Sequence, residues 1–200
     1  VLTTARNVYK CLDNDGNTAS TVEPTGTATT VLTTADGYKW KFMYTLSASQ
    51  QANFLSTDFM AVATDSTVSS ASIDGAIDVI KIKTAGSGGT NGTHTGIAIR
   101  GDGSGGVCSV TVAGGLVTAV TVTTAGTGYT FGTVSNAQIV TAGATSLSGA
   151  ELDVIIPPKG GHGKNAIEEL GGFYVMMNTS LEGTESGNSG DLTVANDFRK

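Results

Sequence analysis

Hydrophobic and polar residues alternate along several short segments of this chain, which is the period expected of a half-buried β-strand. The segments predicted as strands by this pattern are Asn7–Leu12, Lys39–Leu46, Phe59–Ala63, Leu116–Thr124, Glu151–Ile156 and Phe173–Leu181. Gly114 and Gly115 directly precede the fourth segment and predict a hairpin turn. The polar runs Glu182–Asp191 and Thr64–Ser72 predict an exposed loop and a domain boundary, respectively.

Two short segments carry helix signals instead. Ser47 begins the first, which extends toward Leu55. The second is Asn165–Leu170, where Asn165 and Glu168 have the spacing of an N-terminal cap and Gly171 supplies a stop. We therefore predict a mainly β fold of the α+β type with two short helices.

An internal repeat occupies the middle of the chain. Ile82–Thr93 aligns with Val122–Thr133 forty residues later, and each copy is a strand that runs into a glycine-rich loop. A further strand is predicted after each loop, at Ile97–Arg100 and at Ala137–Thr141. Two such copies are typical of a small β-sandwich, a barrel or a short stacked array. We predict an inserted Gly/Thr-rich β-repeat domain over 73–150, interrupting a discontinuous domain of 1–65 and 151–200.

Composition narrows the classes of function. The net charge is −6, which disfavours a nucleic-acid binder because such proteins show a basic face. Only 14% of the residues are charged, a low fraction that suits a surface covered by other proteins. No apolar run reaches transmembrane length, so membrane insertion is not expected. Two cysteines, Cys11 and Cys108, do not form a disulfide framework. We also expect the chain to be a piece of a longer protein.

The motifs that could carry chemistry are better explained as turns. Gly101–Gly106 matches G-x-G-x-x-G, but a strand follows where the dinucleotide fingerprint requires a helix. Asp13–Asn17 has its glycine at the fourth position and lacks the later glutamate of an EF-hand loop. His162 stands in a glycine loop, Gly160–Lys164, with no orienting partner evident nearby in sequence. No catalytic residue, metal ligand or cofactor is predicted.

One strand is dense in aromatic residues. Trp40, Phe42 and Tyr44 share a face, which could stack bases or sugars but is more often part of a core. We expect this strand and the Asn165–Leu170 helix to share one core, with the Gly160–Gly163 loop setting the chain direction between them. The candidate packing or interface residues are Tyr38, Trp40, Phe42, Tyr44, His162, Glu168 and Leu170.

Several blocks resemble one known family in the same order. They are Asn7–Cys11, Pro24–Gly26, Asp36–Tyr44, Phe54–Phe59, Pro157–Gly163, Ile167–Gly171, Tyr174–Met176 and Asn196–Arg199. These blocks are similar to the baseplate wedge subunit of T4-like contractile-tailed phages, the gene product eight family. The resemblance covers roughly the first 62 and last 50 residues, and the central repeat is similar to β-repeats of phage tail proteins.

The resemblance implies a non-enzymatic virion protein of the tail baseplate, assembled in the host cytoplasm. It also implies a homodimer or higher oligomer that docks onto other baseplate wedge proteins. The alternative is a tail-associated glycan-binding β-module, for which Tyr129 and Phe131 are the aromatics of the repeat. A third hypothesis, a tail-associated hydrolase, lacks a paired acid and base or a nucleophile.

Overall fold

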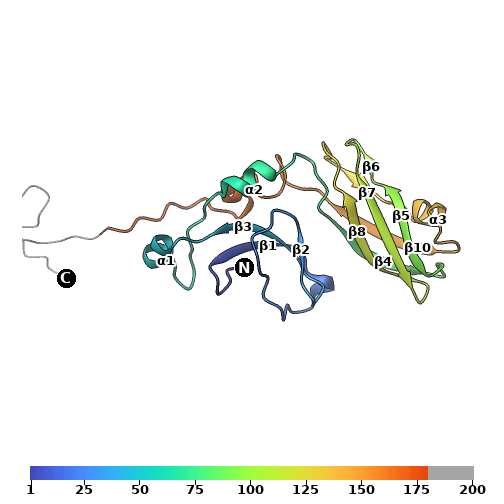
Figure 1. Ribbon diagram of the computed structural model, residues 1–200, viewed down its shortest axis with the longest axis horizontal. Coiled ribbons are helices and arrows are strands. Elements are labelled where there is room, and N and C mark those ends of the chain that lie inside the picture. Colours follow the sequence, from blue (N-terminus) through green and yellow to red (C-terminus); the bar gives the residue numbers. More distant parts are fainter. Residues whose placement is uncertain (180–200) are drawn as a thin grey trace, which may run out of the picture. The chain divides into compact units, whose positions relative to one another are not determined.

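The computed structural model describes residues 1–179, and its contacts divide the chain into two compact units. The first comprises Val1–Ser47 with Val62–Phe173, and the second comprises Ala48–Ala61 with the segment that begins at Tyr174. All described strands lie in the first unit, with short helices between them, and the described part of the second unit holds one short helix (Figure 1). The predicted mainly β, α+β fold is therefore confirmed.

The N-terminal part of the first unit forms a three-stranded antiparallel sheet. Its strands are β1 (Asn7–Asp13), β2 (Leu32–Thr33) and β3 (Lys39–Thr45), in the order β1-β3-β2. Tyr9 lies opposite Phe42 and Cys11 opposite Trp40, with a register shift between Val8 and Tyr9. The strands predicted from alternation at Asn7–Leu12 and Lys39–Leu46 are thus confirmed.

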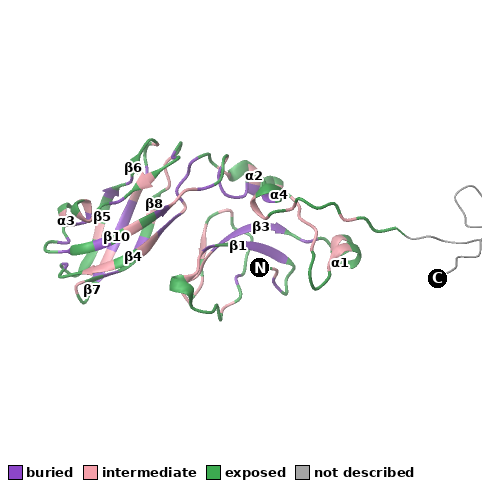
Figure 2. Cartoon of the chain, turned by 180° about the vertical axis from the view of Figure 1, so that it is seen from behind, coloured by how far each residue is buried: buried purple, intermediate pink, exposed green. Residues whose placement is uncertain are grey.

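Both faces of β3 are buried. On one face Trp40 and Phe42 form a cluster with Tyr9 and with Val68, and the rings of Tyr9 and Phe42 meet edge to face at 5.7 Å. Met43, on the other face, is completely buried. Figure 2 shows this burial concentrated on β1 and β3. The aromatic face is core, as expected, and offers no open stacking platform.

The repeat region forms a second sheet system, here called the β-module. Its strands are β4 (Val79–Ser87), β5 (Gly92–Ala98), β6 (Arg100–Gly101), β7 (Val107–Ala113), β8 (Leu116–Thr124), β9 (Gly132–Thr133) and β10 (Ser148–Ile155). β5, β7 and β8 pair in that order, β10 pairs with β4, and β6 pairs with β9. β4 also lies close to β8, so the β10-β4 and β5-β7-β8 sheets are neighbours in the β-module (Figure 1).

One apolar core fills the β-module. It includes Ile77, Ile80, Ile97, Val110 and Ile139, which are at most 2% exposed. Helix α3 (Asn136–Thr141) supplies Ile139 and contacts both β5 and β10, one strand from each of the two sheets. A helix therefore contributes to this core at a position where the sequence pattern predicts a strand.

The two repeat copies use their glycines in the same way. Gly86 and Gly126 both adopt left-handed φ values, 68° and 66°. A Cβ atom on Gly86 would lie 2.8 Å from the backbone of β10, and one on Gly126 would lie 2.5 Å from the Gly106 nitrogen. Each Thr-Ala-Gly sequence thus ends a strand where a neighbouring backbone comes too close for a side chain.

Helices are more numerous than predicted. The described residues contain four α-helices: α1 (Ala48–Phe54), α2 (Ser66–Ala71), α3 and α4 (Ala166–Glu169). α1 and α4 confirm the two predicted helices. α2 lies within the polar run Thr64–Ser72, and it begins where the Asp65 carboxylate accepts hydrogen bonds from the backbone N–H groups of Thr67 and Val68. α3 replaces the strand predicted at Ala137–Thr141.

Two other strand predictions fail within the described residues. Phe59–Ala63 belongs to no strand, and Phe59 is 58% exposed. The part of Phe173–Leu181 that the structure describes, 173–179, is likewise in no strand. The end of that segment and the loop predicted at Glu182–Asp191 lie outside the described residues. Alternation alone does not make a strand when no partner edge is available.

The predicted end of the repeat domain at residue 150 does not coincide with the end of a strand. It falls inside β10, and Glu151–Ile155 pair with β4, so the β-module extends to Ile155.

Asp13–Asn17 forms the end of β1 and a turn, with the 3-10 helix η1 at Asp15–Asn17. In the described residues, no group of three or more acidic, His or Cys side chains could hold a metal ion. The division into a discontinuous domain and an insertion stays a prediction.

Candidate functional site

The loop Gly160–Lys164 is built on glycines that no other residue could replace without strain. Gly160, Gly161 and Gly163 have φ values of 88°, 92° and 85°, which L-residues with a side chain rarely adopt. A Cβ on Gly161 would lie 2.3 Å from the carbonyl oxygen of Ile73. The predicted demanding turn is therefore present, and it holds His162 against the segment that precedes β4.

His162 has a partner that its sequence neighbourhood does not reveal. Its Nδ1 lies 2.5 Å from Oε1 of Glu169, at the end of α4, and the two side chains are 4% and 2% exposed. The Gly163 N–H donates to Oε2 of the same carboxylate at 2.7 Å, and the Lys10 ammonium donates to Oε1 at 2.9 Å. Glu169 thus connects β1, the glycine loop and α4.

The ionisation of Glu169 follows from these partners. Burial alone would raise its pKa, because a carboxylate loses hydration inside a protein. The hydrogen bonds from His162, Gly163 and Lys10 outweigh burial and hold the pKa at about 2. Glu169 is therefore a carboxylate at neutral pH, and His162 must donate to it through Nδ1–H.

This arrangement leaves the other ring nitrogen of His162 without a partner. Nε2 is buried and makes no hydrogen bond among the described residues. When the ring is neutral, a proton on Nδ1 leaves Nε2 as an acceptor. A buried acceptor without a donor costs about 1–3 kcal/mol, so Nε2 is the polar atom of this region with an unused hydrogen-bonding capacity.

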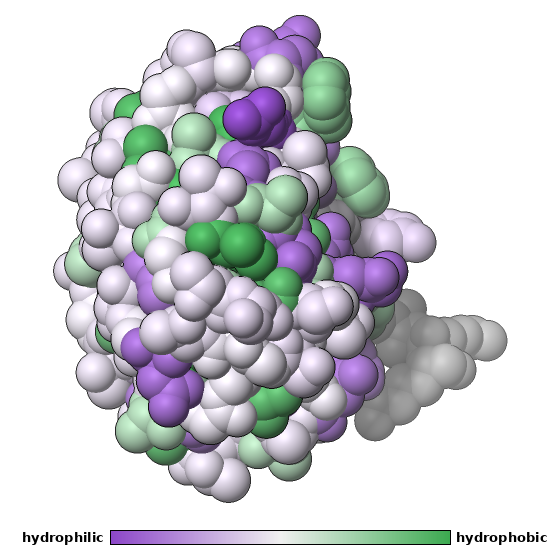
Figure 3. All heavy atoms as spheres, turned by 90° about the vertical axis from the view of Figure 1, so that its right-hand side faces the viewer, coloured by the Kyte–Doolittle hydropathy of each residue, from purple (hydrophilic) through white to green (hydrophobic). Residues whose placement is uncertain are grey.

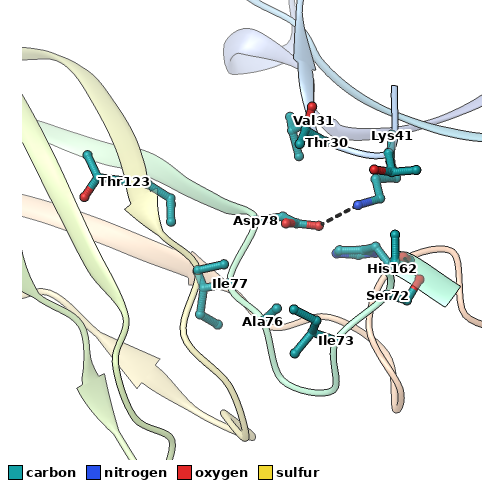
Figure 4. A pocket seen from close by; sticks show the side chains of 14 residues that line it. Thr30, Val31, Lys41, Ser72, Ile73, Ala76, Ile77, Asp78, Thr123 and His162 are labelled. Carbon is teal, nitrogen blue, oxygen red and sulfur yellow. Dashed lines mark hydrogen bonds and ion pairs between the residues drawn. The ribbon is translucent and has the colours of Figure 1, made fainter. Parts of the chain in front are cut away.

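His162 lines a cavity of about 370 Å³. Across it, the Lys41 ammonium lies 3.3 Å from Oδ2 of Asp78, and the Lys41 side chain is only 8% exposed. In Figure 4 the imidazole ring extends toward this ion pair, while Ile73, Ala76 and Ile77 form an apolar wall. The cavity thus combines an acceptor, an ammonium and a carboxylate with an apolar surface.

The serine of this cavity is not paired with the histidine ring. The Ser72 hydroxyl is positioned to donate to the carbonyl oxygens of Val68 and His162, each at 2.8 Å. A histidine activates a serine as a nucleophile through a hydrogen bond between the hydroxyl and a ring nitrogen. Ser72 instead positions the loop through the two carbonyl oxygens.

The other predicted residues do not line the cavity. The Tyr38 ring stacks on Trp40 at 5.3 Å, and the Tyr38 hydroxyl donates to the Thr18 carbonyl. Tyr44 is buried, which raises its pKa to about 12. Glu168 is exposed and Leu170 half-buried. Val68 joins the cluster of Trp40 and Phe42 and also faces Gly163, so α2 connects β3 with the glycine loop.

The sequence pattern did not predict Glu169, Lys10, Lys41 or Asp78 as site residues. Glu169 adjoins Glu168 in a short helix, where neighbouring residues point in different directions, so the pair predicts no shared site. The available signal was the spacing of His162 and Glu169 around a capped helix start, which can fold a carboxylate back onto the preceding loop. Lys10 is 159 residues from Glu169, and no local pattern predicts that contact.

A separate feature is the apolar surface of the second unit. Tyr174, Val175 and Met177 are 84%, 90% and 91% exposed, and no residue of α1 is buried. The Asn178 side chain donates to the Asn53 carbonyl and attaches this segment to α1. We call Tyr174–Met177 the apolar arm. The β-module surface seen in Figure 3 differs, since its apolar side chains lie in small scattered groups.

The comparisons leave the family open. Searches of protein-family models, of curated proteins and of solved structures each found no match to this chain. In the described residues, none of the helices has the length and apolar character needed to cross a membrane.

Proposed function

We propose that this chain is a structural subunit of a phage contractile-tail baseplate, of the wedge class, that acts through protein–protein interfaces in virion assembly. The observation that carries the proposal is the apolar arm. Three large side chains that are 84–91% exposed are costly to leave in water, because each fully buried side chain of this size gains about 1.5–3 kcal/mol. Contiguous exposed apolar residues mark interaction sites.

The buried residues support the same proposal. Lys10, His162 and Glu169 come from three of the blocks that resemble the wedge family, and they meet in one ion-paired cluster. The matched blocks therefore contribute to packing. A protein that acts through protein–protein interfaces requires a rigid scaffold and does not require a reactive group. No catalytic role is proposed.

The proposed partners are other baseplate wedge proteins, with a homodimer or higher oligomer as the subunit itself. The location that follows is the tail baseplate of the virion, after assembly in the host cytoplasm. The glycan-binding alternative for the repeat is not proposed. Tyr129 is only 3% exposed, and its hydroxyl donates to the Ile99 carbonyl, so Phe131 alone is left as an exposed aromatic.

The test is a co-purification with the baseplate proteins encoded beside this chain. Val175→Asp and Met177→Asp, separately and together, should weaken capture of the partner by tenfold or more, since each places a charge in an apolar contact. Phe131→Asp is the matched control, because Phe131 is 59% exposed on the β-module. Capture that is unchanged by both arm substitutions, or absent for the unaltered chain, would contradict the proposal.

A further inference from the structure

The cavity beside His162 has the features of a small-ligand site. Its volume of about 370 Å³ lies within the range of small-molecule pockets, about 300–1,000 Å³. Its walls come from β3, from the segment before β4 and from β8, through Lys41, Asp78 and Thr123. The segment Thr29–Val31 forms a further wall (Figure 4). These parts belong to one compact unit of the fold.

The charged groups that line the cavity, Lys41 and Asp78, restrict the kind of ligand that can bind there. The Lys41 ammonium is neutralised by Asp78, so a free anion gains little from it, and a free cation gains little from Asp78. A purely apolar ligand would leave the ion pair and the His162 Nε2 without additional partners. The ligand that fits is neutral and carries donors and acceptors on neighbouring atoms.

We propose that this cavity binds a neutral polyhydroxyl ligand, through a vicinal diol of the kind found in a sugar unit. One hydroxyl donates to His162 Nε2 and accepts from Lys41, and its neighbour donates to Asp78. The apolar wall of Ile73, Ala76 and Ile77 receives the C–H face of the ring. Nε2 is not exposed to solvent, so binding requires a small movement of the imidazole ring.

Neither Tyr129 nor Phe131 lines this cavity, although Val122, Thr123 and Ala125 of the second repeat copy do, and the site does not depend on the apolar arm. Glu169 is a positioning residue in it, because its carboxylate holds Nδ1–H and thereby presents Nε2 as an acceptor. The glycine loop places the ring at the cavity wall. A ligand hydroxyl would supply the partner that Nε2 lacks.

The experiment uses the full chain labelled with ¹⁵N-histidine. The chain has two histidines, and His94→Gln leaves His162 as the single signal. Methyl glycosides of glucose, galactose and mannose are titrated while the Nε2 resonance is followed. At least one glycoside should shift this resonance saturably. Sodium acetate, methylammonium chloride and acetamide should leave it unchanged, since they carry a free charge or lack a diol.

Two variants test the contacts. Asp78→Asn should weaken glycoside binding about tenfold or more, because hydrogen bonds to charged groups are the strong ones. Asp153→Asn is the control, since Asp153 lines a different cavity. Thr30→Phe should block the site without removing a charge, and it covers the case in which Asp78→Asn does not fold. No shift with any glycoside, an equal shift with acetate, methylammonium or acetamide, or full binding by Thr30→Phe would overturn the proposal.

Discussion

The Nδ1 atom of His162 lies 2.5 Å from Oε1 of Glu169, and both side chains are almost completely enclosed. The same carboxylate accepts hydrogen bonds from Lys10 and from the Gly163 backbone. One side chain of α4 thus holds β1 and the glycine loop together. The consequences of this arrangement for stability can be measured directly.

Replacing Glu169 by Gln should lower the free energy of unfolding by about 3 kcal/mol, the scale for breaking a buried ion pair on one side. The amide keeps the shape of the side chain but leaves the Lys10 ammonium without a carboxylate. Urea denaturation at pH 7 measures the difference. Glu168→Gln changes the adjacent, exposed carboxylate and should cost less than about 0.5 kcal/mol. Equal losses for the two variants would contradict the assigned role of Glu169.

The stabilisation by Glu169 should depend on pH in the acid range. Its folded-state pKa, about 2, is below the ordinary value of 4.5. A depressed carboxyl pKa means that the stabilisation is fully present above about pH 4.5 and is lost as the pH falls toward 2.

The measurement is the difference in unfolding free energy between the unaltered chain and Glu169→Gln at pH 7, 4 and 3. This difference should shrink as the pH falls. The subtraction is needed because Asp102, which accepts hydrogen bonds from Thr130, also has a pKa of about 2. A difference that is constant from pH 7 to 3 would show that the Glu169 carboxylate is not the stabilising species.

Gly161→Ala should destabilise the chain by more than the cost of a left-handed residue alone. Its φ is 92°, and the new Cβ would lie 2.3 Å from the Ile73 carbonyl oxygen. Gly16→Ala is a matched control, because Gly16 has a φ of 70° with nothing within 4 Å of the added atom. The control should cost about 1–2 kcal/mol and Gly161→Ala clearly more, by thermal or urea denaturation. Similar losses would mean that the loop moves freely away from Ile73.

Tyr129→Phe should cost about 1–3 kcal/mol, the penalty for leaving buried polar groups without a partner. The Tyr129 hydroxyl donates to the Ile99 carbonyl at 3.0 Å and accepts from the Gly106 N–H at 3.1 Å. Tyr174→Phe removes a hydroxyl from a side chain that is 84% exposed and should change stability little. The expected outcome is a lower melting temperature for the first variant only.

The predicted strands that form are those in which the alternating residues lie beside another strand. Lys39–Thr45 has β1 and β2 on its two sides, and Leu116–Thr124 follows a two-glycine turn that forces it back onto β7. Phe59–Ala63 has a comparable apolar content but no adjoining strand edge. Since pairing is decided by distant parts of the chain, composition cannot distinguish these cases.

Helix α3 shows a different error. The repeat alignment predicted a strand at Ala137–Thr141, yet Ser135 and Gln138 form a capping box in which each side chain bonds to the backbone of the other residue. That local signal was present in the sequence and outweighs the alignment. For the site, the glycines predicted the turn around His162, but the contact between Lys10 and Glu169 joins residues too distant for any local pattern.

The pairing of β4 with β10 has a consequence for how such a chain can evolve. Val79, where the β-module begins, lies directly opposite Ile155, where it ends. Two antiparallel strands with adjacent ends can be closed by a two-residue turn. Under the predicted division, a short turn in place of residues 79–155 would therefore reconnect the chain, and the Lys10–Glu169–His162 cluster would keep all of its members.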